Sequence, residues 1–433
     1  MARSDSPINR REFLGSSAKN AAGVAAGVVG VGVGVGLVKA GTGPGDTVNL
    51  GIIGVRSQGK SLATALARLP GAHIATLCDV DDSVLATAVR AVAAEQGRTP
   101  AMERDFRRLL DDPAIDAVVI ATPNHWHATM AAMTLQAGKD LYLETPVTHT
   151  LAEGQMLAAV AQSSNRIVAV GLPQRSGQQF LSAVDYLRSG RLGTVHLAKA
   201  WTVQQRKPIG RHADTAVPDG VDYDLWLGPA PARPFNVNRF HFNWQWFWDY
   251  GGGELGHWGV QMLDVARWGL GVGLPRQIAA MGGKHHFRDD QETPDTLLVN
   301  YAYPQATITW EHRLWSPFAQ DGRSAAVAFH GDLGTLIVDR GGWKVYGGRD
   351  APTAPGGDFL NPHLQDFLDC VRSRQQPACD LEAGRQSSAL CHLGNIAYRL
   401  GRSVDFDPVR ESFGSDRAAA GFANREPRGP WTL

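Results

Sequence analysis

The sequence lacks an excess of charge of either sign: its 433 residues include 42 Lys and Arg against 42 Asp and Glu. A chain without net charge has no overall field that would draw it to nucleic acid or to an anionic membrane surface. Cysteine is also scarce, and the four cysteines show no CxxC spacing, which excludes a disulfide framework and a zinc knuckle. The hydrophobic fraction of 43% can still fill sizeable cores, so wholesale disorder is excluded. The length exceeds what one core usually fills, so we expect two domains.

The first forty residues have the features of an export signal rather than of a folded domain. The pair Arg10-Arg11 precedes an apolar stretch over residues 21–38, and the small residue Ala40 follows. Paired arginines, a modest apolar segment and a small residue at its end are typical of a twin-arginine signal. Six glycines dilute the apolar stretch, which weakens it as a membrane span. We therefore expect periplasmic export through the twin-arginine machinery with cleavage near Ala40, the alternative being a retained membrane anchor.

Short apolar runs alternate with helical segments in residues 46–172. The runs that predict strands are 48–54, 73–79, 117–123, 140–143 and 167–171. Strands that alternate with helices are typical of βαβ units and of a parallel, doubly wound sheet. The sequence therefore predicts an α/β, Rossmann-type domain in this half of the chain.

The pattern changes after residue 173 to longer alternating runs with many aromatic residues. Strands are predicted at 195–204, 277–283, 296–303, 307–313, 325–330 and 334–338, and helices at 256–268 and 363–400. We expect an α+β substrate domain with a large open, mainly antiparallel sheet over 173–404, followed by a docking tail at 405–433. Because an open sheet face needs cover, a homo-oligomer is expected.

A glycine-containing turn follows the first strand and precedes a helix. Gly54, Arg56, Ser57 and Gly59 occupy a segment with the spacing of G-x-G-x-x-G, which brings backbone N–H groups and a helix N-terminus against a pyrophosphate. Asp79 ends the second strand, where an acid accepts hydrogen bonds from ribose hydroxyls. Arg56 replaces the middle glycine, so its side chain either obstructs the pyrophosphate or pairs with a phosphate. We predict NAD rather than NADP as the cofactor, the alternative being a domain that has lost its ligand.

Several motifs occur in a fixed order through residues 46–433. They are Thr122-Pro123-Asn124-His125-Trp126-His127, Gly138-Lys139-Asp140, Glu144-Thr145-Pro146, Gln174-Arg175-Ser176, residues 224–229 (DLWLGP), 251–254 (GGGE), 290–296 (DQETPDT) and 428–431 (RGPW). Together they resemble the Gfo/Idh/MocA family of oxidoreductases, most closely its exported, sugar-directed branch of the glucose–fructose oxidoreductase type. The resemblance implies an N-terminal Rossmann domain, a C-terminal open-sheet domain and a substrate site at their junction.

The segment after the strand at 117–123 adds further candidates for the cofactor site. Ligands bind at strand carboxyl ends in doubly wound sheets, so we expect His125 to line the nicotinamide pocket. With the motif residues around it, the predicted cofactor contacts are Thr122, Pro123, Asn124, His125, His127 and Glu144. A metal held by histidine and carboxylate is the weaker alternative, because the spacing is not a metal motif, and none is expected.

The resemblance also marks three replacements in the catalytic positions. In that family, a lysine lies near the nicotinamide, and an aspartate or asparagine is followed four residues later by a proton-transferring histidine. Thr145, His257 and Gln261 occupy these positions here. Oxidation of a carbinol needs a base for the hydroxyl proton, and only His257 of the three can accept it. A helix from residue 256 would place His257, Gln261 and Asp264 on one face, so we predict His257 as a relocated base oriented by Asp264 or Gln261. The alternative is a buried histidine hydrogen-bonded within the domain.

The aromatic run over residues 240–250 alternates with polar groups, a pattern that suits sugar rings, although core packing or a subunit contact would explain much of it. Arg175, His241 and Asp249 are the polar residues that we expect nearest the substrate. The sequence therefore predicts an exported, NAD-binding oxidoreductase of a carbohydrate that retains its cofactor. One alternative is a redox-neutral glycoside hydrolase, lyase or epimerase that passes through a transient ketosugar. The other is a catalytically inactive sugar- or dinucleotide-binding homologue.

Overall fold

The computed structural model describes residues 47–347 and 351–431. The predicted export signal lies outside the described residues. Within those two ranges, no helix combines the length and the apolar character that crossing a bilayer requires. The four cysteines are buried and free.

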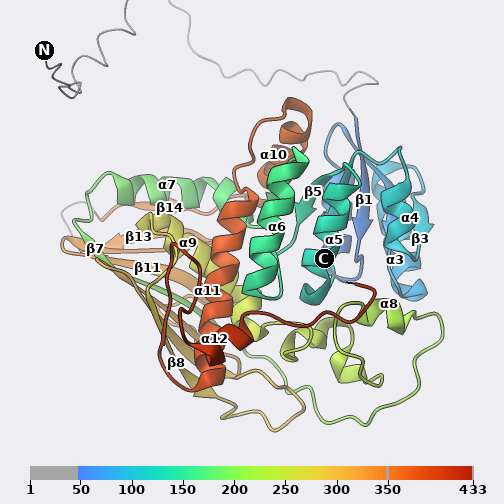
Figure 1. Cartoon of the computed structure of the whole chain (residues 1–433). Coiled ribbons are helices and arrows are strands. Elements are labelled where there is room, and N and C mark those ends of the chain that lie inside the picture. Colours follow the sequence, from blue (N-terminus) through green and yellow to red (C-terminus); the bar gives the residue numbers. More distant parts are fainter. Residues whose placement is uncertain (1–46, 348–350, 432–433) are drawn as a thin grey trace, which may run out of the picture. The chain divides into compact units, whose positions relative to one another are not determined.

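The first sheet has six parallel strands in the order β3-β2-β1-β4-β5-β6. Their bounds are β1 Val48–Ile53, β2 Ala72–Cys78, β3 Ala101–Glu103, β4 Ala117–Ile120, β5 Asp140–Leu143 and β6 Val168–Val170. β4 and β5 are buried along their whole length, as expected for strands covered on both faces. The predicted doubly wound parallel sheet is confirmed (Figure 1).

Five helices connect these strands: α2 Gln58–Ala67, α3 Asp82–Gln96, α4 Phe106–Asp111, α5 Asn124–Gln136 and α6 Leu151–Ser164. Local signals set several of their ends. Asp81 caps α3 by accepting from two backbone amides, and Thr150 and Glu153 form a reciprocal capping box on α6. α5 begins at Asn124, directly after the strand-end residues Thr122 and Pro123. Its first turns are buried on every side, so they carry no amphipathic period from which the helix could be predicted.

The second sheet has nine strands in the order β14-β13-β12-β11-β7-β10-β9-β8-β15. Only β7 and β10 pair in parallel, so the predicted mainly antiparallel sheet is confirmed. The strands are β7 Val195–Val203, β8 Gln277–Gly283, β9 Thr296–Ala302, β10 Thr307–Arg313, β11 Ala325–Gly331, β12 Gly334–Asp339, β13 Gly342–Tyr346, β14 Thr353–Pro355 and β15 Val404–Asp405. Alternate residues of β9 and β10 are buried, which gives these strands one core face.

Helices α7 (Gln178–Arg188), α9 (Val260–Leu270) and α11 (Leu381–Leu400) cover one face of this sheet (Figure 1). The prediction of a single helix over 363–400 is wrong: α10 (Leu360–Ser373) ends where Arg374 adopts a left-handed conformation, and α11 starts after Pro377. The predicted helix over 256–268 also differs. Its first turn, Leu255–Gly259, is a π-turn that leads into α9. This turn determines where the catalytic candidates point.

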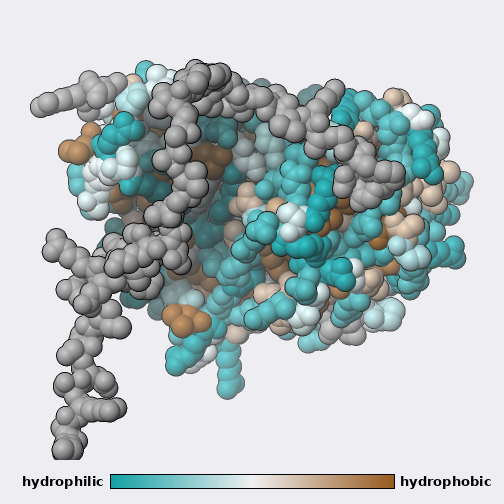
Figure 2. Space-filling view, turned by 90° about the horizontal axis from the view of Figure 1, so that it is seen from above, coloured by the Kyte–Doolittle hydropathy of each residue, from teal (hydrophilic) through white to brown (hydrophobic). Residues whose placement is uncertain are grey.

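The uncovered side of the sheet carries exposed apolar residues. Met281 and Leu298 are paired across β8 and β9 and are 79% and 50% exposed. Figure 2 shows hydrophilic residues dominating the visible surface, with hydrophobic residues in scattered patches. The homo-oligomer expected from an open sheet stays a prediction.

Candidate functional site

The glycine turn after β1 is tightly built against the ends of β4 and α2. Gly54 has a φ of +81°, and a Cβ atom there would lie 2.8 Å from the carbonyl oxygen of Ala121. A Cβ at Gly59 would lie 1.8 Å from the carbonyl oxygen of Gly54. Only glycine fits at both positions. No side chain caps the N-terminus of α2, so its first amides face outward as an anion-binding group.

Asp79 braces this turn from the end of β2. Its carboxylate accepts hydrogen bonds from the backbone N–H of Val55 at 2.8 Å and of Asp81 at 3.2 Å. Burial raises the pKa of Asp79 to about 6, although these hydrogen bonds oppose the shift. The carboxyl is therefore mainly ionised at neutral pH and can also accept from a ligand hydroxyl.

A cavity of about 280 Å³ opens beside the turn and is closed by the aromatic segment around residue 240. It brings together residues from both halves of the sequence. Those that line it include Gly54, Arg56, Ser57, Asp79, Thr122, Pro123, Trp126, Trp226, Phe240, His241, Trp244 and His257. Its glycine cradle, uncapped helix N-terminus, carboxylate and aromatic walls fit a dinucleotide.

Arg56 does not block the turn. Its side chain is exposed at the cavity and forms no ion pair within the described part of the chain. Its charge reaches His241, whose pKa is lowered first by burial and then by Arg56. Of the two roles open to Arg56, the geometry fits the cation that meets a phosphate.

His241 joins the two halves of the site. It lies in a short 3₁₀ segment of the second half of the chain, with a φ of +49°, and its Nε2 is 2.9 Å from the carboxylate of Asp81 in the first. Backbone hydrogen bonds from Asp82 to Gly220 and from Asp222 to Val80 support the same junction. His241 thus closes the cavity over the β2–α3 connection.

His257 projects from the π-turn into the same cavity. The side chain is exposed to the cavity, and it makes no hydrogen bond within the described residues. Desolvation, followed by the charges of Arg206 and Arg340, lowers the pKa of His257 to about 3. The ring is neutral at physiological pH and free to accept a proton from a ligand.

Thr145 and Gln261, predicted to stand in place of the family lysine and histidine, contact each other. The Gln261 side-chain amide donates to the Thr145 hydroxyl and to the Gly171 carbonyl, both at 3.0 Å. Glu144 beside them accepts from Gln58 at 3.0 Å, and burial raises its pKa to about 7. The neutral, hydrogen-bonded pair of Thr145 and Gln261 therefore lies beside the partly protonated carboxyl group of Glu144.

Asp264 is not brought to His257. Its buried carboxylate accepts two hydrogen bonds from Arg175, at 2.8 and 2.9 Å, and one from Ser387 at 2.7 Å. The π-turn shifts the helical phase, so the shared face predicted for residues 257, 261 and 264 does not form. Arg175, predicted near the substrate, is held in this ion pair, outside the residues that line the cavity.

His125 and His127 are buried by the start of α5. The Nε2 of His125 is 2.9 Å from the carbonyl oxygen of Trp226, and His127 lies within hydrogen-bonding distance of the carbonyls of Pro146 and Thr122. Neither His125 nor His127 lines the dinucleotide cavity, and Asn124 lines a second cavity, of about 470 Å³.

Asp249, predicted near the substrate, pairs with Arg233 and lines the second cavity as well. No group of three metal-ligating side chains occurs in the described ranges.

Sequence reasoning missed two features beside the catalytic candidates. Gln174 is fully buried, and neither atom of its side-chain amide has a partner. Glu254, also fully buried, pairs with Arg206 at 2.8 Å, yet burial raises its pKa to about 7. The Gln174-Arg175-Ser176 motif could have pointed to Gln174 as a site residue. No sequence pattern indicated that Arg206 and Glu254 would form a pair.

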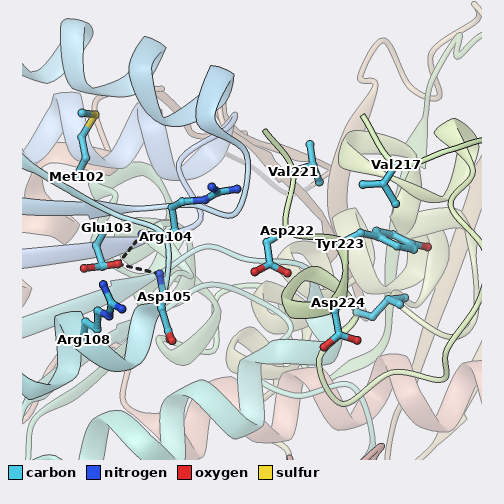
Figure 3. A pocket seen from close by; sticks show the side chains of 11 residues that line it. Met102, Glu103, Arg104, Asp105, Arg108, Val217, Val221, Asp222, Tyr223 and Asp224 are labelled. Atoms are coloured by element: carbon cyan, nitrogen blue, oxygen red, sulfur yellow. Dashed lines mark hydrogen bonds between the residues drawn. The ribbon is translucent and has the colours of Figure 1, made fainter. Parts of the chain in front are cut away.

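A larger groove of about 920 Å³ lies at the edge of the first sheet, between β3 and α8 (Tyr223–Leu227) (Figure 3). Its carboxylates serve local structure. Glu103 accepts from the backbone amides of Arg104 and Asp105, and Asp222 caps α8. These groups are engaged as caps and turns, so the groove is a poorer candidate for chemistry than the dinucleotide cavity.

Comparison with known proteins agrees with this geometry. Residues 48–172 match the model of the Gfo/Idh/MocA oxidoreductase family, NAD-binding Rossmann fold, and residues 200–284 and 357–433 match that family's C-terminal alpha/beta domain. A glycosyl hydrolase family 109 protein of Shewanella pealeana is 28% identical over 54% of this chain and 56% of its own length. A second, of Shewanella sp. strain ANA-3, is 32% identical over 45% of this chain and 46% of its own. The chain thus spans about half the length of these curated relatives.

Two solved structures share the fold. A levoglucosan dehydrogenase in complex with NADH and levoglucosan aligns with a TM-score of 0.66 and 19% identity, over 83% of this chain and 99% of that one. The aldose-aldose oxidoreductase of Caulobacter crescentus, complexed with glycerol, aligns with a TM-score of 0.64 and 19% identity, over 83% and 100%. Both domain models match in order, and the two sheets and the glycine turn are those that the motifs imply. The chain therefore belongs to the Gfo/Idh/MocA family of oxidoreductases, with an NAD-binding Rossmann fold.

Proposed function

We propose that the protein is an oxidoreductase that transfers hydride between a carbohydrate or sugar derivative and an NAD that it retains. The observation that carries this proposal is that the glycine turn and the unpartnered His257 line one cavity. The sugar ligand of a structural neighbour, levoglucosan, supports the choice of substrate class.

The residues of the first domain would hold and select the cofactor. The backbone of the Gly54 turn and the guanidinium of Arg56 would contact the pyrophosphate, while Asp79 accepts from the ribose hydroxyls. The ionised carboxylate would repel a 2′-phosphate, which favours NAD over NADP. When bound, the nicotinamide supplies the hydride acceptor.

His257 would take the hydroxyl proton as the substrate carbon loses hydride. A neutral imidazole with a pKa of about 3 holds a proton only briefly, so the proton would pass from the ring to solvent water at the cavity. Thr145 carries no charge to stabilise an alkoxide. The positive charges of Arg206 and Arg340, which act on His257, would take over this part of the missing lysine's role.

The direct test is to purify the protein, denature it and assay the supernatant for nicotinamide dinucleotides. We expect about one NAD(H) per chain, because the proposal requires a retained cofactor. A protein that is purified without dinucleotide and does not bind added NAD would overturn the proposal. If the protein binds no dinucleotide but still binds sugars without turnover, it would be an inactive binding homologue.

A second candidate function is supported by the curated relatives, which are named as glycosyl hydrolases. Oxidation at one sugar carbon acidifies the neighbouring C–H, so loss of that proton can expel the glycosidic group. Water then adds across the resulting double bond, and return of the hydride from NADH restores the oxidised carbon. Return of the proton or the hydride to the opposite face would instead epimerise the sugar. Such a cycle would cleave or epimerise a sugar without net formation of NADH. Chromatography of products from aryl glycosides, with absorbance at the NADH band followed in parallel, separates the two functions: product without NADH selects the redox-neutral one.

We also propose periplasmic export by the twin-arginine route, from the arginine pair and the glycine-diluted apolar stretch. Replacement of Arg10 and Arg11 by lysine should leave the precursor in the cytoplasmic fraction of the producing cells. Release of the unmodified protein from cells only by detergent would favour the retained anchor.

A further inference from the structure

A second cavity, of about 470 Å³, lies apart from the dinucleotide cavity. It is formed by the starts of α5 and α6, by α11, and by the chain at and after α12 (Arg417–Phe422), which lies against α11 (Figure 1). The two cavities share no lining residue. Its volume falls within the range of about 300–1,000 Å³ that is usual for small-molecule sites.

Four residues that line this cavity each carry a buried polar atom that has no hydrogen-bond partner among the described residues. These atoms are Nδ1 of His149, Nε2 of His392, Oδ1 of Asn395 and Nη1 of Arg425. Asn395 is only 8% exposed, and its Nδ2 donates to the Gly252 carbonyl at 2.9 Å, while its Oδ1 has no partner among the described residues. Buried polar groups without a partner are unfavourable and rare, so four around one cavity point to a bound molecule that pairs with them.

These groups are held in place by their neighbours. His392 and Asn395 are three residues apart on α11, and His149 directly precedes the capping box of α6. Arg425 is fixed by an ion pair with Glu153 at 2.6 Å and by a hydrogen bond to the carbonyl of His125. An anchored guanidinium with one free nitrogen is a preorganised donor, not a mobile surface charge.

The charges around the cavity balance. Arg399 and Arg425 face Asp249 and Glu426, with Asp249 already paired to Arg233. The Arg399 guanidinium carbon lies 5.0 Å from the centre of the Trp248 ring. Burial lowers the pKa of His392 to about 4 and that of His149 well below its ordinary value, so both rings are neutral. A phosphate or another strong anion would find no surplus of positive charge.

We propose that this cavity is a second ligand site that binds a neutral, polyhydroxylated molecule such as a sugar ring or a polyol. Hydroxyl groups both donate and accept, which matches a wall made of imidazole nitrogens, an amide oxygen and a guanidinium nitrogen. The aromatic side chains of Trp248 and Phe422 add apolar surface for the C–H groups of such a ligand. The inference does not depend on the reaction at His257.

The rim offers a substitution that fills the cavity without disturbing its wall. Gly421 lines the cavity, and a Cβ atom added there would meet nothing within 4 Å. Gly273 is equally open but lies outside the cavity, so Gly273→Trp is the matched control for Gly421→Trp. Asn424→Trp, also on the exposed rim, is a second blocking variant should the first fold poorly.

The experiment is calorimetric titration of the protein with its bound cofactor, using methyl α-D-glucopyranoside and myo-inositol as probes and inorganic phosphate as the anionic comparison. We expect a sugar or polyol site that persists in Gly273→Trp and in His257→Ala, and that weakens at least about tenfold in Gly421→Trp or Asn424→Trp. Soaked crystals should show the probe beside Asn395.

Several results would overturn the inference. These are no binding of either probe, equal binding to the blocked and control variants, tighter binding of phosphate than of the probes, or a probe that lies only beside His257. Because His257→Ala is the variant that tests the redox proposal, loss of turnover there with intact binding at the second cavity separates the two proposals.

Discussion

The Gln261 amide donates a hydrogen bond to the Thr145 hydroxyl at 3.0 Å, which joins the two residues predicted to stand in place of a family lysine and histidine. A lysine at residue 145 would bring a charge and a long side chain against the buried carboxyl of Glu144. A threonine needs only a neutral partner, and Gln261 supplies it. Thr145 and Gln261 are therefore structurally coupled, and we predict that proton transfer falls to another group.

Replacement of His257 should separate its role from that of the neutral pair. We expect His257→Ala to lower kcat by about 100-fold or more, the usual contribution of a positioned general base. Thr145→Val removes one neutral hydrogen bond and should lower kcat by less than about tenfold. Steady-state kinetics on one sugar substrate check both. Equal losses in the two variants would show that His257 has no special role.

The pH dependence of turnover follows from the lowered pKa of His257. With a folded pKa of about 3, the ring stays neutral and able to accept a proton throughout pH 5–8. We therefore expect no acid limb of kcat/KM near pH 6.5 from this residue, and a loss only as pH falls below 4 toward 3. Comparison of the pH profile with that of His257→Gln provides the check. An acid limb near pH 6.5 that is present in the wild type and absent in the variant would contradict the assignment.

The ion pair between Arg175 and Asp264 should be a determinant of stability. Asp264 is fully buried and the Arg175 side chain is only 11% exposed. Removal of Arg175 leaves the buried Asp264 with only the longer ion pair to Arg267, at 3.6 Å, and breaking a buried pair costs up to about 3–5 kcal/mol. We expect Arg175→Leu to lower the free energy of unfolding in urea by that amount. Arg68→Leu, which breaks the exposed pair with Glu95, is the control and should leave the unfolding midpoint unchanged.

Glu144 should make the folded state less stable as pH rises. Its folded pKa of about 7 exceeds its ordinary value of 4.5, so the native state binds the extra proton between these limits. The associated stability is fully present below about pH 4.5 and is lost as pH rises through 7. Urea unfolding at pH 5 and pH 8 should show a smaller difference for Glu144→Gln than for the wild type. An unchanged difference would mean that Glu144 is ionised throughout.

The sequence predicts the elements better than it predicts what their side chains contact. β5, β8 and β10 have the predicted bounds because short apolar or alternating runs end at turn residues there. β3 and α4 went unpredicted, since elements of three and six residues have little periodicity. The cavity residues of the glycine turn follow from local spacing. The capture of Asp264 by Arg175 does not, because its partner is 89 residues away and a π-turn alters the helical phase.

Arg56 gives the sharpest test of how the turn holds its cofactor. If the guanidinium meets a phosphate, Arg56→Glu should weaken NAD binding by well over tenfold, because a like charge then faces the pyrophosphate. Arg56→Gly restores the usual glycine and loses only the charge contact, so its loss should be smaller and should shrink further at high salt. Fluorescence titration of cofactor-stripped protein measures both. Tighter binding in Arg56→Gly than in the wild type would show that the side chain obstructs the pyrophosphate.

Gly59→Ala is the control in which NAD binding should be lost. Its Cβ would lie 1.8 Å from the Gly54 carbonyl oxygen, so the turn cannot keep its shape.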